Sequence, residues 1–238
     1  MQFDIISVFP KIFESVFKES LIQRAQNTGI LKIRNHDLRA YTLDKHKRVD
    51  DYPFGGGVGM ILMVEPIARA LESIKLINPN AYRILLSPSG NPFDQKKARE
   101  LSKKEGLILV CGRYEGVDHR ISEHFVDEEL SIGDYVLSGG EIPAMVVVES
   151  VARLIPGVVG DSQSIEMESF ETDLLEYPQY TRPREFRGYE VPDVLTSGNQ
   201  AKILEWQKNQ ALQKTARIRP DLLNQNKIDQ NLQLKPPS

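Results

Sequence analysis

The chain of 238 residues carries 30 Lys and Arg against 33 Asp and Glu, a formal net charge of -3. This balance excludes a bulk basic field for a polyanion, so any nucleic-acid binding must use local patches and shape. No apolar run approaches the ~18 residues of a membrane span, and the single cysteine, Cys111, excludes an intrachain disulfide. Because the strand-like start also lacks a basic leader, we expect a cytoplasmic protein with no membrane partner.

Strand and helix patterns alternate through the first two-thirds of the chain. Residues 3–9 predict a strand, after which Pro10 can start a helix running through 11–26 and stopping at Gly29. A half-buried strand at 31–34 and a long irregular stretch at 40–60 come next. The remaining patterns predict helices at 64–77, 94–104 and 142–153, and strands at 82–86 and 107–111.

The later strands are too apolar to face water on either side. Strands of this kind, alternating with helices, predict an α/β fold with a mostly parallel sheet covered on both faces. Composition changes after Pro156-Gly157. We therefore expect a first domain over 1–160, a flexible linker over 161–172 and a small α-helical domain over 173–238. Ser197 or Asn199 can cap the helix of that domain, and the polar tail from Asn224 is expected to fray.

Three glycine-bearing loops follow strand-like runs, at 87–92, 112–116 and 131–141. Ligands of open α/β sheets bind outside the carboxyl ends of the strands, so these loops predict one shared pocket. The third loop combines free main-chain groups with the apolar residues Ile132, Tyr135, Val136 and Leu137, which suits an adenine ring. Its glycines at 133, 139 and 140 allow positive φ and close approach. The alternative is a glycine-rich surface turn.

Familiar nucleotide and metal signatures are missing from the sequence. There is no P-loop and no G-x-G-x-x-G, which favours a cofactor without a polyphosphate. The four histidines show no H-x-x-x-H or H-E-x-x-H pairing, so each is expected to be a surface or capping residue: His36, His46, His119 and His124. Cys111, at the end of a buried run, is expected to be a small core residue rather than a nucleophile.

Basic and aromatic residues gather near the start of the second domain. Arg182, Arg184 and Arg187 lie among Tyr177, Tyr180, Phe186 and Tyr189. This combination suits looped RNA, whose phosphates are neutralised while unpaired bases stack. A solvated charged face is the alternative.

These segments together resemble the bacterial tRNA (guanine-N1)-methyltransferases, a family in the SPOUT class of S-adenosylmethionine enzymes. The resemblance runs in order over nearly the whole chain to about Leu223. Its carriers are FDIISVFP (3–10), VDDYPFGGGVGM (49–60), LILVCGRYEGVD (107–118), SIGDYVLSGGE (131–141), RLIPGVVG (153–160), YPQYTRP (177–183) and VLTSGNQA (194–201).

The resemblance implies a SPOUT-type deep trefoil knot at the carboxyl end of the sheet, which no spacing argument would propose because threaded chains are rare. It also implies a homodimer that binds S-adenosyl-L-methionine inside the knot. The substrate would be a tRNA with guanosine at position 37, methylated on N1 and clamped between the catalytic domain of one subunit and the C-terminal domain of the other. The family's dependence on a divalent ion also suggests Mg2+, although the sequence shows no ligand cluster for it.

Site residues carried over from the family fall into three groups. The tRNA contacts would be Asp50, Gly55, Gly57, Gly59, Arg182 and Ser197. The cation that stabilises charge on the base would be Arg153, before the Ile-Pro-Gly turn. The cofactor contacts would be Leu86, Ser87, Pro88, Gly90, Gly112, Tyr114, Glu115, Gly116, Ser131, Ile132, Gly133, Asp134, Tyr135, Val136, Leu137, Gly139, Gly140 and Pro143.

The general base is where this sequence departs from the family pattern. The family places Asp before Ser-Phe in the linker, whereas this chain has Glu168 before Ser169-Phe170. We assign Glu168 as the base, ahead of Glu166 or Asp161. Glutamates in an acidic linker are often only solubilising, and Arg153 can simply favour a helix C-terminus. A SPOUT enzyme acting on another RNA, or a non-catalytic RNA-binding protein with a vestigial pocket, therefore stay open as alternatives.

Overall fold

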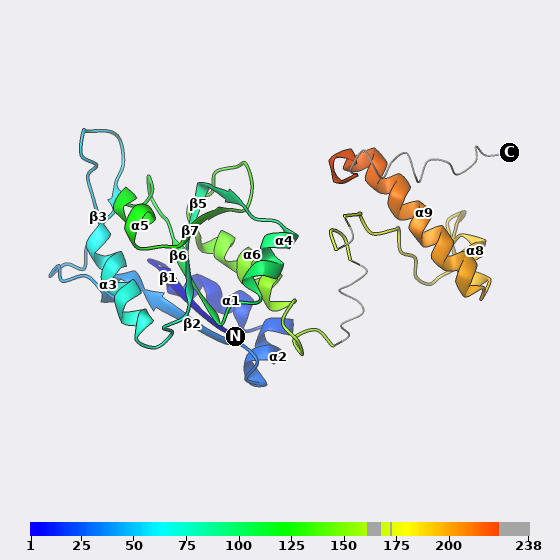
Figure 1. The fold of residues 1–238 in the computed structure, drawn as a ribbon, viewed down its shortest axis with the longest axis horizontal. Helices are drawn as coiled ribbons and strands as arrows, with labels where there is room; N and C mark the ends of the chain where they lie inside the picture. The colour runs from blue at the N-terminus through cyan, green and yellow to red at the C-terminus, as the bar shows by residue number, and fades with distance from the viewer. Residues whose placement is uncertain (161–167, 172, 224–238) are drawn as a thin grey trace. The chain divides into compact units, whose positions relative to one another are not determined.

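The computed structural model describes residues 1–160, 168–171 and 173–223, which divide into two compact units, Met1–Gly160 and Asp161–Ser238. The first unit is built on a five-stranded sheet in the order β2-β1-β6-β5-β7, in which every neighbouring pair is parallel (Figure 1). Its strands are β1 (Gln2–Ser7), β2 (Lys32–Asp37), β5 (Tyr82–Pro92), β6 (Gly106–Cys111) and β7 (Glu128–Ser131). The predicted α/β fold with a mostly parallel sheet is confirmed.

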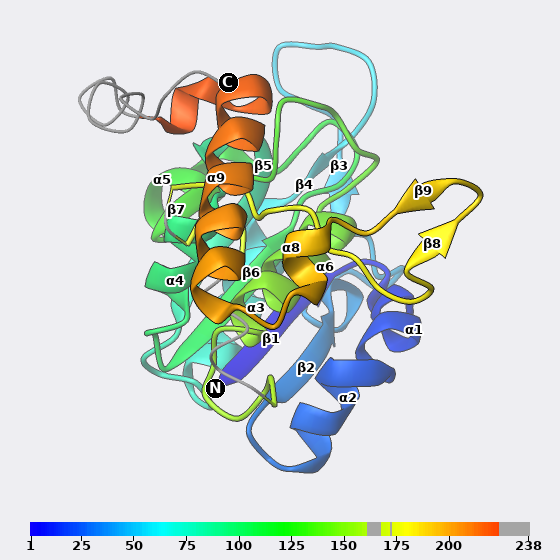
Figure 2. The same ribbon diagram turned by 90° about the vertical axis from the view of Figure 1, so that its right-hand side faces the viewer.

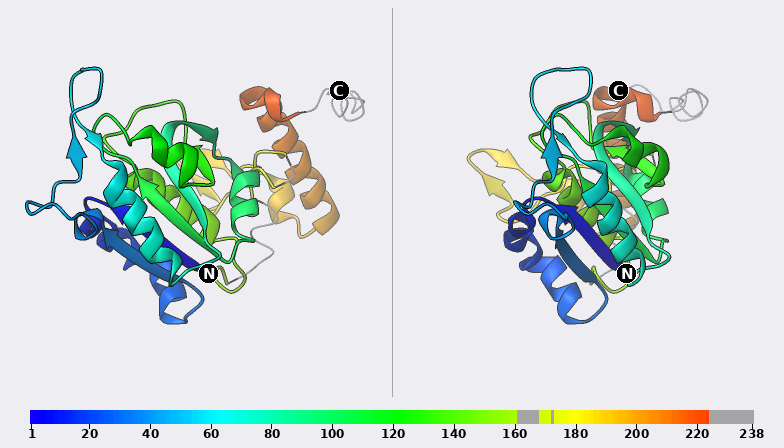
Figure 3. Two further views of the ribbon diagram at one scale, coloured as in Figure 1. Left: turned by 60° about the vertical axis from the view of Figure 1, so that its left-hand side comes forward. Right: turned by 90° about the vertical axis from the view of Figure 1, so that its left-hand side faces the viewer.

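Alternate residues of the central strands enter two separate cores, one on each face of the sheet. In β6, Leu107 and Leu109 join the first core, whereas Ile108 and Val110 join the second. The first face is covered by α1 (Glu14–Phe17), α2 (Ser20–Asn27), α4 (Gln95–Leu101) and α6 (Glu141–Ala152). The second is covered by α3 (Val64–Lys75) and α5 (His119–His124), as Figure 3 shows. Both faces of the strands are therefore shielded from water, as their composition predicts.

The single helix predicted over 11–26 is wrong, because the chain breaks there. It forms the 3-10 helix η1 (Pro10–Phe13) and then α1, and it restarts as α2 at Ser20, which has a φ of 50°. At about 100° per residue, a continuous helix would place Ile22 about 180° around its axis from Phe13. Both side chains nevertheless lie in the first core. The break lets both apolar groups face the same sheet.

Several other elements extend or add to the predicted ones. β5 continues to Pro92, with an irregularity between Leu86 and Asn91 in its pairing with β7. The 40–60 stretch contains η2 (Leu38–Ala40) at its start and β3 (Asp50–Asp51), which pairs antiparallel with β4 (Ile61–Leu62). The loop between β3 and β4 extends away from the body of the first unit (Figure 3). Helix α5 had no prediction, because its six residues are too short to show periodicity.

The second unit contains one long helix. α9 (Gln200–Ile218) begins after Asn199, whose side chain accepts a hydrogen bond from the Lys202 amide and so acts as the predicted cap. The unit also holds α8 (Asp193–Thr196), η3 (Pro220–Leu222) and a hairpin of β8 (Glu185–Phe186) and β9 (Tyr189–Glu190), drawn in yellow in Figure 2. No helix within the described ranges is both long and apolar enough to cross a membrane. The tail from Asn224 lies outside the described residues.

Candidate functional site

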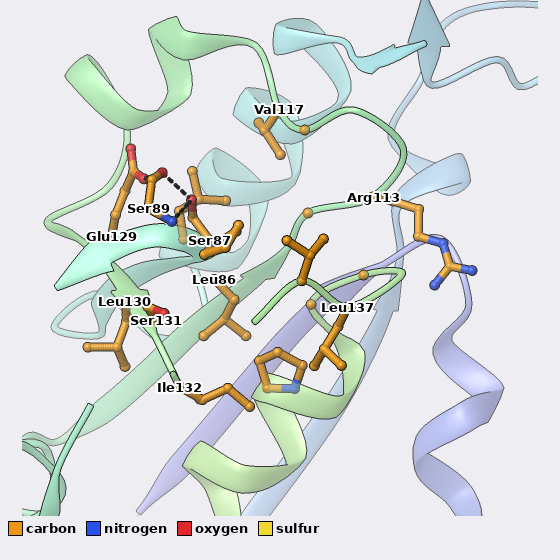
Figure 4. Close-up of a pocket in the computed structure, with 18 of the residues that line it drawn as sticks. Leu86, Ser87, Ser89, Arg113, Val117, Glu129, Leu130, Ser131, Ile132 and Leu137 are labelled. Atoms are coloured by element: carbon orange, nitrogen blue, oxygen red, sulfur yellow. Dashed lines mark hydrogen bonds between the residues drawn. The ribbon is translucent and has the colours of Figure 1, made fainter. Parts of the chain in front are cut away.

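The three glycine-bearing segments surround one cavity of about 420 Å³ (Figure 4). The first of them, 87–92, is not a separate loop but the last part of β5, and the other two follow β6 and begin at the end of β7. Parallel strands bring their carboxyl ends to one edge of the sheet, and this shared edge gathers loops that are distant in sequence. Leu86, Ile132 and Leu137 form apolar parts of the wall, while Ser87, Ser89 and Glu129 form a polar part (Figure 4). The predicted common pocket is confirmed as a feature of the fold.

Most of the predicted cofactor contacts lie on the wall of this cavity. Those that line it are Leu86, Ser87, Pro88, Gly112, Tyr114, Glu115, Gly116, Ser131, Ile132, Gly133, Tyr135, Val136, Leu137, Gly139, Gly140 and Pro143. Gly90 and Asp134 are not among the lining residues. The structure thus brings these side chains together, while their role in binding a cofactor stays a prediction.

Two glycines hold the loops in place through close backbone approach. A Cβ at Gly90 would lie 2.4 Å from the Leu130 nitrogen, and one at Gly140 would lie 2.7 Å from the Cys111 Cα. The Gly140 amide also donates to the Gly112 carbonyl oxygen at 2.8 Å. Gly140 has a φ of -81°, and neither it nor Gly139 has a positive φ. The positive φ that glycine allows is therefore not used at these two positions. At Gly140 the backbone of Cys111 and Gly112 passes too closely for a side chain, whereas a Cβ at Gly139 would meet the side chains of Glu141 and Arg113.

The loop at 112–118 is held from behind by the β3–β4 hairpin. The Glu115 amide donates to the Met60 carbonyl, the Leu62 amide to the Gly116 carbonyl and the Asp118 amide to the Leu62 carbonyl, each at 3.0 Å. Buried or half-buried loops need such partners for their polar main-chain groups. The hairpin therefore fixes the loop at 112–118, which forms one wall of the pocket.

Several residues on the wall escaped the sequence analysis. Ser89, Arg113, His119, Ser122 and Glu129 all line the cavity. Ser122 lies on α5, an element that periodicity did not reveal. A polar residue in the short strand that leads into the third loop was a usable signal for Glu129, since β7 ends at the ligand-binding edge.

A buried carboxylate lies beneath the loops. Glu141, in the first turn of α6, is only 2% exposed. It accepts a hydrogen bond from Ser7 Oγ at 2.7 Å and pairs with Arg113 across 3.4 Å between NH1 and Oε2. A buried charge needs such partners, and the helix N-terminus also favours a carboxylate. Glu141 thus ties β1, the 112–118 loop and α6 together.

Arg153 and Glu168 occupy different units. Arg153 is the C-cap of α6, a helix of 12 residues whose other end is at the pocket. Helical rise puts it on the order of 15 Å along the axis from Pro143, and it does not line the cavity. Glu168 begins a turn of the second unit, where its carbonyl oxygen accepts from the Glu171 amide at 3.4 Å. Their pairing in one site stays a prediction, and the alternatives Glu166 and Asp161 lie outside the described residues.

The turn after Glu168 is anchored to the long C-terminal helix. Ser169 Oγ accepts from the Glu176 amide at 3.0 Å, and the Glu176 carbonyl accepts from Lys214 Nζ at 2.9 Å. The Leu175 amide donates to Thr215 Oγ1 at 2.8 Å, and Thr215 is fully buried. The turn is therefore linked to α9 through residues 175 and 176.

The predicted tRNA contacts also divide between the units. Asp50 lies in β3 and Gly55, Gly57 and Gly59 in the projecting loop after it. Arg182 is exposed in the second unit. Ser197 is the C-cap of α8 and donates to the Val194 carbonyl at 2.7 Å, so its hydroxyl already has a local hydrogen-bond acceptor.

One histidine prediction needs correction. His36 is not a surface or capping residue: its side chain is 12% exposed, and its Nε2 lies 2.8 Å from the fully buried Asp4 carboxylate. Gln2 and Asn78 also donate to Asp4, at 2.7 and 2.9 Å. Burial raises the pKa of Asp4, but the hydrogen bonds from His36, Gln2 and Asn78 outweigh it and lower that pKa overall. His36 is a structural partner of a carboxylate.

Cys111 is the buried core residue that the sequence predicts. The thiol is buried, and its burial together with the nearby Glu141 charge raises its pKa well above the usual value. Such a thiol is a poor nucleophile. Within 1–160, 168–171 and 173–223, no three His, Cys, Asp or Glu side chains form a group that could hold a metal ion.

Fold and pocket together define a class: an α/β protein with a cavity of small-molecule size at the carboxyl edge of a parallel sheet and with no P-loop motif in its sequence. Comparison with known proteins is more specific. The family model described as "tRNA (Guanine-1)-methyltransferase TrmD" matches residues 1–225, and the chain belongs to this family, which is part of the SPOUT class. The predicted family is confirmed.

Curated relatives agree with the family assignment. A tRNA (guanine-N(1)-)-methyltransferase of Citrifermentans bemidjiense is 51% identical over 224 residues, covering 94% of this chain and 90% of the relative. The enzyme of the same name from Dictyoglomus turgidum is 52% identical over 230 residues, covering 97% and 93%. That of Carboxydothermus hydrogenoformans is 53% identical over 223 residues, covering 94% and 87%.

Proposed function

We propose that this chain transfers a methyl group from S-adenosylmethionine to N1 of guanosine 37, beside the anticodon of tRNA. The observation that carries the proposal is the composition of the pocket wall. The chain belongs to the family, and its pocket is lined by segments that carry the family motifs, such as 112–117 and 131–140. A tRNA substrate also supports a cytoplasmic location.

The pocket fits the methyl donor in size and in chemistry. A cavity of about 420 Å³ falls within the range of small-molecule sites, roughly 300–1,000 Å³. Ile132, Leu137 and Pro143 offer apolar surface for the faces of an adenine, and the main chain of 131–140 offers polar groups for its edge. When bound, the donor supplies an electrophilic methyl group, whose bond to sulfur breaks with the electron pair left on sulfur.

The chain's own residues must prepare the guanine. Guanine N1 carries a proton, and its lone pair is delocalised. Glu168 would accept that proton as general base, an effect typically worth ~10²–10⁴-fold in rate. Arg153 would stabilise the negative charge that develops on O6. The new bond then joins N1 to the methyl carbon, and the N1 proton resides on the Glu168 carboxyl.

Glutamate in place of the family's aspartate changes the reach of the base by one methylene. The turn that follows is fixed by Ser169 and by contacts with α9. The extra length must therefore be absorbed by the Glu168 side chain itself, through a different rotamer.

A homodimer is part of the proposal, because α6 is apolar on two faces. Ala144, Val147, Val148 and Val151 fill the first core, while Ile142 and Val146 are exposed. Phe9, Ile12 and Val16, in and around η1 and α1, are also exposed, and η1 packs against α6. A helix that is apolar all round is normally buried. A second copy of this chain would cover the face and bring a second-unit Glu168 to an Arg153 of its partner.

The deep trefoil knot is likewise proposed. Support comes from the third loop, which leaves β7 at the sheet edge and meets the end of β6, two strands away, through Gly139 and Gly140. Mg2+ was expected from the family alone. Among the described residues, no three His, Cys, Asp or Glu side chains form a group that could hold it.

A methyl-transfer assay on an unmodified tRNA transcript tests the proposal. We expect labelled methyl to appear in a transcript with guanosine at position 37 and not in a matched transcript with adenosine there. Transfer to both, or to an unrelated RNA alone, would favour another SPOUT-class RNA methyltransferase. Donor binding and tRNA binding without any transfer would favour the non-catalytic RNA-binding alternative.

A further inference from the structure

Two charged residues of the pocket wall, Arg113 and Glu129, differ in whether an opposite charge lies beside them. Arg113 has such a partner. Its guanidinium pairs with the buried Glu141 and lies 4.8 Å from the centre of the Phe9 ring. Figure 4 shows the Arg113 side chain directed away from the cavity, toward the side opposite Glu129. The positive charge of Arg113 is therefore neutralised beneath the loops and contributes little to the field inside the cavity.

Glu129 carries the opposite charge on the facing wall, and its partners are hydroxyl groups. One carboxylate oxygen accepts a close hydrogen bond from Ser122 Oγ on α5, and the other accepts from Ser89 Oγ at 3.4 Å. Ser89 Oγ also lies 2.8 Å from Ser87 Oγ. Of the Lys, Arg and His residues in the described parts of the chain, none forms an ion pair with Glu129. These hydroxyls fix the carboxylate without cancelling its charge.

Glu129 is also better placed than the other carboxylate on the wall. Glu115 lines the cavity but is exposed, whereas Glu129 is half-buried. Water and salt screen an exposed charge far more than one against an apolar wall. The cavity beside Glu129 is lined by Leu86, Leu130 and Ile132 (Figure 4). Glu129 therefore dominates the field that a ligand meets there.

We propose that Glu129 is a specificity-determining residue that favours the cationic methyl donor over its spent product. The inference rests on the proposed function. S-adenosylmethionine carries a sulfonium, whereas S-adenosylhomocysteine, its product, carries a neutral thioether at the same atom. Apart from the transferred methyl group the two molecules are alike, so a charged wall distinguishes them by their difference of one positive charge. Loss of that charge on transfer weakens the attraction and aids product release.

The variant Glu129→Gln tests this, because it keeps the size and one hydrogen-bond acceptor while removing the charge. Isothermal titration calorimetry would measure the dissociation constants of S-adenosylmethionine and S-adenosylhomocysteine at low ionic strength. We expect donor affinity to fall roughly three- to tenfold, the effect of one partly screened charge several ångströms away. Product affinity should change less than about twofold. Glu72→Gln, on the exposed side of α3, makes the same net-charge change far from the pocket and should alter neither.

Two further measurements keep a structural role apart from an electrostatic one. Thermal unfolding checks that the Glu129→Gln variant is folded, and Glu129→Asp, which retains the charge, should keep the preference for the donor. Added salt should weaken donor binding more in the wild-type protein than in the Gln variant. Equal losses for donor and product, or no loss for either, would overturn the inference while leaving the proposed function intact. Failure of the wild-type protein to bind either ligand would overturn both.

Discussion

Replacing Gly140 with alanine tests whether the close crossing of the third loop over β6 builds the pocket. The new Cβ would lie 2.7 Å from Cys111 Cα and 3.0 Å from the Gly112 nitrogen. Both are backbone atoms, which cannot rotate away, so the loop itself must move. Overpacking of this kind costs about 1–3 kcal/mol, and weakening the Gly140-to-Gly112 hydrogen bond costs about 1 kcal/mol more. A total of about 3 kcal/mol corresponds to a fall in Tm of roughly 6–12 °C.

Differential scanning calorimetry gives the Tm of the Gly140→Ala variant, and titration calorimetry gives its affinity for S-adenosylmethionine. We expect donor affinity to fall at least about tenfold, since the displaced loop carries Ile132 to Leu137. Gly160→Ala is the matched control, because no heavy atom lies within 4 Å of its added Cβ. It should change stability by less than about 0.5 kcal/mol. A Gly140→Ala variant with unchanged Tm and affinity would refute the reasoning.

Three other changes test the base, the dimer and the buried acid. Glu168→Gln should abolish methylation while S-adenosylmethionine binding survives, and Glu168→Asp should remain active; unchanged turnover in the Gln variant would reject the base assignment. Val146→Asp should yield monomers by light scattering and lose at least tenfold in activity, because a charge would be buried in the proposed interface; an active monomer would contradict a shared site. The lowered pKa of Asp4 stabilises the protein above its unfolded-state value of 3.8, and this contribution is lost as pH falls through the folded value. The Asp4→Asn variant should therefore have a lower free energy of unfolding at neutral pH, and that free energy should fall less steeply than in the wild-type protein below about pH 4, as measured by denaturant titration. The same pH dependence of the free energy of unfolding in both proteins would argue against this role.

In the first unit, strands β1, β2, β5 and β6 and helices α3, α4 and α6 followed from sequence. Burial of a strand on both faces leaves a continuous apolar run such as 107–111, whereas the two-residue strands β3 and β4 are too short to show a pattern. Helix breaks did not follow. The apolar spacing of 11–26 fits a helix, but the demand that Phe13 and Ile22 share one core overrides it. Helix α5 was missed for a different reason: with six residues, its capping by Asp118 matters more than its periodicity.

The sequence predicted where the pocket lies but not which of its charged residues are paired. Three loops at one sheet edge follow from the parallel order of the strands. The partners of Arg113 and Glu129 do not, because Glu141 and Ser122 reach them from α6 and α5 across the fold. The composition of a loop indicates which main-chain segments can approach a ligand. Tertiary packing alone decides whether a charged side chain, such as Arg113, is paired with an opposite charge.

Polar residues in β1, the strand beside the central β6, connect this packing to the site. β1 is buried throughout from Phe3 to Ser7, yet it carries Asp4 near one end and Ser7 at the other. Burying either costs free energy unless it is hydrogen-bonded. Asp4 gains donors from β2 and the α3–β5 turn, and Ser7 donates to Glu141, which holds Arg113 and the start of α6. Ser7 therefore fixes two of the three pocket loops to the middle of the sheet. A polar residue inside an otherwise apolar strand was the sequence signal for this connection.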